Sequence, residues 1–203
     1  MLHKITGWRW LPRGMLLLWS LLAPPAFAHT GDIGGGVAAG FLHPISGLDH
    51  LLAMVAVGIW GAFLGRPLLW ALPVAFPLMM VVGGVLGIAA VPLPSVESAI
   101  ALSVIVLGVA IAVAWRAPAV IAVAVIAVFA VFHGHAHGTE LPHAATPTVY
   151  AVGLVIANGL LHLDGIALGL FARNPFGATA LRAGGGAIAA TGVWILLGSP
   201  GVA

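Results

Sequence analysis

The sequence predicts an all-α membrane protein in which six transmembrane helices follow a cleavable N-terminal signal peptide. Three observations predict this class. Hydrophobic residues make up 62% of the 203 residues and charged residues only 6%, whereas a soluble domain carries about 25% charged residues. A short basic and apolar leader opens the chain, and long apolar runs of membrane-spanning length follow it.

Residues 1–28 have the pattern of a signal peptide. Basic residues precede a short apolar run at 15–23, and the segment ends in an Ala-Phe-Ala cleavage pattern. The run is too short to span a bilayer, which needs about 20 residues. Cleavage after Ala28 would leave a transport domain, 29–203, that begins with His29, whose amine and imidazole are candidate metal donors outside the membrane. An uncleaved signal anchor is the alternative.

Six apolar runs follow the leader, and Pro, Gly or Arg residues separate them. Their composition (Ala, Val, Leu, Gly) lacks the polar alternation of membrane β-strands, so we expect helices. The runs are 46–64, 68–90, 97–115, 118–137, 148–171 and 177–198.

The positive charges orient these runs. Every arginine of the expected mature chain lies in or beside the loops after the first, third and fifth runs: Arg66, Arg116, Arg173 and Arg182. A cleaved signal peptide puts the new N-terminus outside, so these loops face the cytoplasm, in agreement with the positive-inside rule. We expect a multi-pass protein of a bacterial inner membrane, embedded in the lipid bilayer, with both termini in the periplasm. A homo-oligomer is left open.

The net charge argues against nucleic-acid binding. Beyond the leader, four arginines oppose five carboxylates, a balance of 4 − 5 = −1 with histidine neutral. Such a chain lacks the basic surface that nucleic acid requires, so no nucleic-acid partner is expected. The chain has nine histidines and no cysteine, which leaves imidazole and carboxylate as its metal donors.

The first histidine motif is His43-Pro-Ile-Ser-Gly-Leu-Asp49-His50. On a continuous helix His43 and His50, two turns apart, would share a face. Pro44 removes a backbone donor and should kink the segment, as in broken helices that line ion sites. Asp49 could bind a metal directly or orient an imidazole. Ionisable residues inside an apolar span are costly, which indicates a functional site.

The second motif is Phe132-His133-Gly134-His135-Ala136-His137-Gly-Thr-Glu140. Helical spacing places His133, His137 and Glu140 on one stripe, and nitrogen with oxygen donors suits nickel, cobalt or zinc. His135 points away from that stripe, and both direct ligation and a supporting role stay open. Gly134 stands where a metalloprotease helix carries its catalytic Glu, which disfavours a protease. We expect the first and fourth runs to share one metal site in the outer half of the membrane.

A third polar group lies in the fifth run. His162 follows Asn158 by one helical turn, and Asp164 comes two residues later. A transfer site on the metal pathway and a polar clamp between helices are both open interpretations.

Together, the two motifs closely resemble the HupE/UreJ family of membrane proteins, associated with nickel supply to hydrogenase and urease. The resemblance covers essentially the whole mature chain and implies a nickel permease. It implies that the metal-binding residues are those of the two motifs, namely His43, Asp49, His50, His133, His137 and Glu140. Nickel and cobalt are not distinguished, and the family implies no permanently bound cofactor and no enzymatic activity.

Two other classes remain as alternatives. A bis-His haem electron carrier would use axial histidines from two helices, and an intramembrane zinc hydrolase could use the histidines together with Ser46. The chain has no Gly-x-x-x-x-Gly-Lys-Ser/Thr loop, so it cannot itself hydrolyse ATP. The source of energy for transport stays open.

Overall fold

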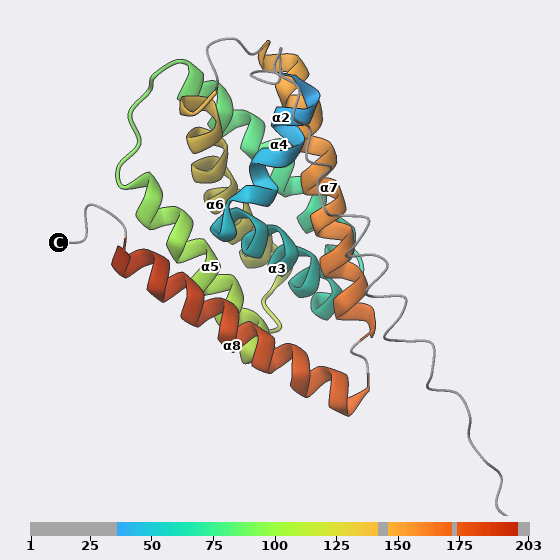
Figure 1. The fold of residues 1–203 in the computed structure, drawn as a ribbon. Coiled ribbons are helices and arrows are strands. Elements are labelled where there is room, and N and C mark those ends of the chain that lie inside the picture. Colours follow the sequence, from blue (N-terminus) through green and yellow to red (C-terminus); the bar gives the residue numbers. More distant parts are fainter. Residues whose placement is uncertain (1–35, 142–145, 172–173, 199–203) are drawn as a thin grey trace, which may run out of the picture. The chain divides into compact units, whose positions relative to one another are not determined.

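The computed structural model describes residues 36–141, 146–171 and 174–198, all within the unit Asp32–Ala203. These residues form seven helices and no strand (Figure 1). The helices are α2 (Val37–Ser46), α3 (Leu48–Leu64), α4 (Leu68–Ile88), α5 (Val96–Ala112), α6 (Ala119–Thr139), α7 (Pro147–Phe171) and α8 (Pro175–Gly198). The predicted signal peptide, its cleavage site and His29 lie outside the described residues.

The helices give a multi-pass membrane protein. Four of them, α4, α6, α7 and α8, are long and apolar enough to cross a membrane, and the bent pair α2–α3 makes a fifth span if it crosses as one. Helix α5 is apolar but shorter, with 17 residues. Each predicted run coincides with one helix from α3 to α8, while α2 was not predicted as a helix. The count of six spans stays a prediction.

Helices α2 and α3 are separated by a sharp bend of 85° at Gly47. Gly47 has an extended backbone, with φ −86° and ψ 114°, and so ends one helix and begins the next. The sequence predicted the break at Pro44, and that position is wrong, because Pro44 lies buried inside α2. A proline removes one hydrogen bond, but its φ near −65° suits a helix, so the chain stays helical until Gly47.

The helices pack closely in pairs, α4 with α6, α5 with α8, and both α2 and α3 with α7. Glycines permit this approach. A Cβ added to Gly83 of α4 would meet the carbonyl oxygen of Val131 in α6, and one added to Gly134 of α6 would meet that of Met80 in α4. Small residues of this kind let backbones touch in membrane helix pairs.

One end of the bundle carries Arg66, Arg116 and Arg182. The Trp60 indole, near the end of α3, donates to the carbonyl of Trp115 at 3.0 Å, and the two rings stack with centroids 5.6 Å apart. Near the start of α8, Arg182 donates to the carbonyl of Ala112 at 2.8 Å. The ends of α3 and α5 therefore lie together with the start of α8. The histidine motifs occupy the opposite ends of α3 and α6.

Candidate metal centre

A pocket of about 220 Å³ lies where the start of α3, the start of α5 and the end of α6 meet. All six residues predicted from the two motifs line it, together with Glu97, which was not predicted from the sequence. The polar residues of the pocket wall are His43, Ser46, Asp49, His50, Glu97, His133, His137 and Glu140. The structure thus brings the first and second motifs together in one place.

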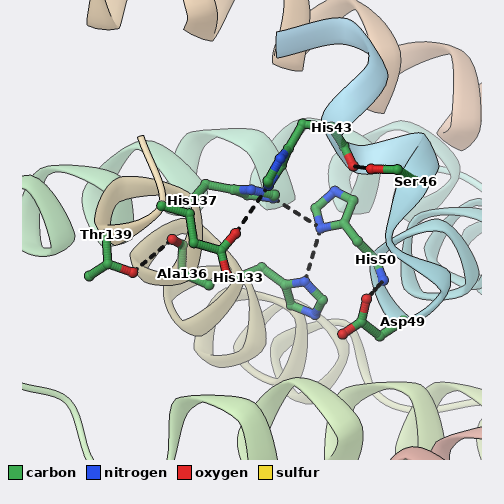
Figure 2. A network of polar contacts seen from close by, with 9 residues as sticks. His43, Ser46, Asp49, His50, His133, Ala136, His137 and Thr139 are labelled. Atoms are coloured by element: carbon green, nitrogen blue, oxygen red, sulfur yellow. Dashed lines mark hydrogen bonds and ion pairs between the residues drawn. The ribbon is translucent and has the colours of Figure 1, made fainter. Parts of the chain in front are cut away.

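The deep part of the pocket is a group of three imidazoles. Nδ1 of His50 lies 3.1 Å from Nδ1 of His133 and 3.1 Å from Nε2 of His137. Figure 2 shows His50 between the other two rings, joined to each by a dashed contact. All three side chains are buried, with exposed fractions of 4%, 1% and 8% in chain order. Two helices, α3 and α6, therefore direct ring nitrogens at one small region.

Hydrogen bonds behind the rings determine which nitrogens carry hydrogen. Nε2 of His50 lies 2.8 Å from Oδ1 of Asn158, an oxygen that can only accept, so this nitrogen donates. The Ser103 hydroxyl donates to the carbonyl of Ile100 at 2.6 Å and therefore accepts from Nε2 of His133 at 2.9 Å. In both rings Nδ1 is therefore unprotonated. The two Nδ1 atoms lie 3.1 Å apart, and Nε2 of His137 is a further neighbour of the His50 nitrogen at the same distance.

This geometry suits a cation. Two unprotonated nitrogens 3.1 Å apart repel each other unless a positive charge lies between them. Nitrogens bound to one ion at about 2.05 Å lie about 2.9 Å apart at right angles and about 3.3 Å apart in a tetrahedron. The observed 3.1 Å falls between these values. Outer hydrogen bonds that orient metal-binding histidines are typical of metal sites, and Asn158 and Ser103 make such bonds here.

A second group of donors lies closer to solvent and shares His137. Ligand atoms of His43, His137 and Glu140 all lie within 4.8 Å of one another. Nε2 of His43 lies 3.2 Å from Oε2 of Glu140, and these two side chains are 32% and 53% exposed. The ring of His137 contacts that of His43 on one side and that of His50 on the other, with centroids 4.8 and 4.6 Å apart. His137 therefore connects the exposed group to the buried one.

Carboxylates surround the entrance. Asp49 is half-buried and its Oδ1 accepts the backbone N–H of His50 at 2.7 Å, while Glu97 and Glu140 are exposed. Three of the four carboxylates in the described part of the chain line this pocket, the fourth being Asp164. A signal for Glu97 was present in the sequence, because it is the one acid at the start of an otherwise apolar run. Ser103 gave no such signal, since single serines are common in membrane helices.

The remaining predicted residues lie outside the pocket wall. Nε2 of His135 donates to the carbonyl of Val91 at 2.8 Å, in the connection between α4 and α5. Asp164 lies on the exposed face of α7. Asn158 contacts His50 from behind, and His162 follows one turn deeper along α7, buried at 2% exposure. The structure therefore separates Asp164 from His162, although the sequence grouped them.

The geometry gives no support to the two alternative classes. Axial histidines of a haem must leave room for the macrocycle between their nitrogens, and the His50 and His133 nitrogens are only 3.1 Å apart. The Ser46 hydroxyl donates to the carbonyl of His43 at 2.7 Å, so it is not paired with an imidazole base.

The fold and the pocket define a multi-pass helical membrane protein with four histidines and three carboxylates around one cavity. The model of the family described as HupE / UreJ protein matches residues 16–195, and the chain belongs to this family. Protein HupE of Rhizobium leguminosarum bv. viciae is 45% identical over 173 residues, which cover 85% of this chain and 91% of that protein. No solved structure is significantly similar.

Proposed function

We propose that this protein is a permease that carries divalent nickel across the bacterial inner membrane from the periplasm, and that cobalt is a second cargo. The observation that carries the proposal is the pair of unprotonated Nδ1 atoms of His50 and His133, which come from different helices and lie 3.1 Å apart. A cation between the two nitrogens would turn the repulsion of their lone pairs into attraction.

The donor set supports a transition metal of intermediate softness. Imidazole nitrogens with carboxylate oxygens suit nickel, cobalt and zinc, whereas copper(I) prefers sulfur donors and magnesium prefers oxygen. Carboxylates at the mouth raise the local concentration of cations, and the imidazoles below select among them. The association of the HupE/UreJ family with nickel supply to hydrogenase and urease supports nickel as the main cargo, and a nickel enzyme as the eventual recipient.

Uptake of radioactive nickel by cells that express the protein tests this proposal. We expect accumulation well above that of cells with an empty vector, and competition by an excess of unlabelled cobalt but not of magnesium. A purified protein that binds nickel and cells that fail to accumulate it would overturn the transport function. Competition by magnesium equal to that by nickel would overturn the proposed donor set.

We propose six spans, with the bent α2–α3 pair and the short α5 each crossing once, behind a cleaved signal peptide. Arg66, Arg116 and Arg182, at the end opposite the pocket, support a cytoplasmic position for that end, because positively charged residues stay inside. The chain has no cysteine, so single cysteines report the orientation cleanly. In intact spheroplasts an impermeant thiol reagent should label Thr146→Cys and not Ala119→Cys. The opposite pattern would refute this topology.

A further inference from the structure

His162 is a buried histidine that the pocket does not use. It is 2% exposed, and its Nε2 has no hydrogen-bond partner among the described residues. A buried polar nitrogen without a partner is costly and is expected to have a functional reason. Nε2 therefore bonds to no neighbouring helix in the described part of the chain.

Asn158 and Phe76 lie between the pocket and His162. Oδ1 of Asn158 accepts from His50 at 2.8 Å, and the Asn158 amide donates to Sδ of Met80 at 3.5 Å. His162 lies four residues after Asn158, on the same face of α7. The ring of Phe76 contacts His133 on the pocket side and His162 on the far side, with centroids 5.5 and 5.8 Å apart.

His162 lies deeper in the membrane than the pocket. Counting from Pro147, Asn158 is about 16 Å and His162 about 22 Å along α7, at 1.5 Å per residue. The hydrocarbon layer is about 30 Å thick, so His162 lies in the half nearer the arginines. On the α3 side it faces Gly58, whose missing Cβ lets the backbones touch at the carbonyl of His162.

We propose that His162 is an inner binding site at which a divalent transition-metal ion stops after leaving the three-imidazole pocket. This inference rests on the proposed transport function. The free donor is the uncharged imidazole nitrogen of His162, one helical turn from Asn158, whose side chain already bonds to His50 and to Met80. Uncharged donors bind a divalent ion more weakly than the carboxylate-rich pocket does. A weaker second site is what conduction requires, since an ion must be able to leave each site.

The decisive variant is His162→Gln, compared with Asp164→Asn on the exposed face of the same helix. In purified protein titrated with cobalt, the wild type and Asp164→Asn should bind one ion tightly and a second ion weakly. His162→Gln should keep the tight site, with a Kd within about twofold, and lose the weak one. Nickel uptake should fall about tenfold or more in His162→Gln and stay near wild type in Asp164→Asn.

Two results would overturn the inner site. One is His162→Gln with both cobalt sites and wild-type uptake, and the other is loss of tight binding as well, which would indicate a structural role. If His162→Gln does not fold, His162→Cys tests the inner site instead, because the chain has no other thiol. A sulfur-to-cobalt charge-transfer band in His162→Cys supports the site, and its absence at saturating cobalt overturns it. A wild-type protein that binds two cobalt ions without transporting nickel would refute only the transport function.

Discussion

The two walls of the pocket are built differently. Helix α6 is uninterrupted from Ala119 to Thr139 and supplies His133, His137 and, at its end, Glu140 from successive turns of one stripe. The opposite wall is broken at Gly47, and its two parts, α2 and α3, are bent by 85°. The continuous wall supplies donors at both depths, whereas the broken wall supplies one histidine to each depth.

The bend explains how His43 and His50 both reach His137. On a straight helix, seven residues separate two side chains by about 10 Å along the axis. In the bent pair, the rings of His43 and His50 contact the ring of His137 with centroids 4.8 and 4.6 Å away. The broken wall therefore places its two histidines around one imidazole of the continuous wall. Changes in either wall should therefore impair the same site.

The largest effect is expected from removing one buried imidazole of each wall. His50→Ala and His133→Ala should each abolish about nine-tenths or more of nickel uptake, because each removes one of the two Nδ1 donors that lie 3.1 Å apart. The double variant should be little worse than either single variant, since groups that act as one unit are strongly non-additive. Uptake of radioactive nickel, normalised to membrane-inserted protein, measures this effect.

Arg66→Ala, at the far end of α3, is the control and should leave uptake near wild type once the protein inserts. Single losses that are partial and multiply in the double variant would show two independent sites, and the shared pocket would then be wrong.

The next effect concerns how α6 is held against α4. Gly83→Ala should destabilise the protein by about 1–3 kcal/mol, because the new Cβ would meet the carbonyl oxygen of Val131 and force the helices apart. Gly84→Ala is the matched control, since its Cβ would find only the carbonyl oxygen of Gly134, at 3.6 Å. Thermal unfolding in detergent measures both. Equal melting temperatures for the two variants would contradict the close α4–α6 contact.

A smaller effect is expected at the mouth. His43→Gln and Glu140→Gln remove donors that are 32% and 53% exposed, so they should weaken capture of the ion without removing the buried imidazoles. We expect KM for nickel to rise by about three- to tenfold while the maximal rate falls by less than about twofold. This combination indicates weaker binding of the ion and not slower transport of the bound ion. Initial uptake rates over a range of nickel concentrations measure both. A loss of maximal rate as large as that of His50→Ala would remove the distinction between the two depths.

The sequence predicted the continuous wall better than the broken one. Helical spacing alone placed His133, His137 and Glu140 on one stripe and turned His135 away from it, and the structure has this arrangement. Helical spacing does not predict where a helix breaks. The position of the break depends on the backbone of Gly47 and on the packing of α2 against α7. The break was therefore predicted at Pro44, because proline is the residue that most disfavours a helix interior.

Contacts between segments that are far apart in the sequence could not be predicted either. Glu97 and Ser103 belong to α5, and only the folded bundle brings the first to the pocket and the second behind His133. Asp164 and His162 are two residues apart, and a helix turns them about 200° from each other, so one is exposed and the other buried. Grouping them by proximity in sequence was therefore misleading.

The smallest effects should come from two matching hydrogen bonds at the ends of the walls. In α2 the Ser46 hydroxyl donates to the carbonyl of His43 at 2.7 Å, and in α6 the Thr139 hydroxyl donates to that of Ala136 at 2.8 Å. Both bonds span three residues, and both side chains are exposed, so each is worth at most about 1 kcal/mol.

Ser46→Ala should raise KM for nickel by about twofold or less, because the bond holds the carbonyl of His43 beside the bend. Thr139→Ala should change KM even less, because the uninterrupted helix already holds His137. Initial uptake rates of the two variants in parallel make the comparison. An increase in KM for Ser46→Ala as large as that for His43→Gln would show that this single hydrogen bond holds the bend. A larger increase in KM for Thr139→Ala than for Ser46→Ala would show that the continuous helix α6 depends more on its hydrogen bond than the bent pair does.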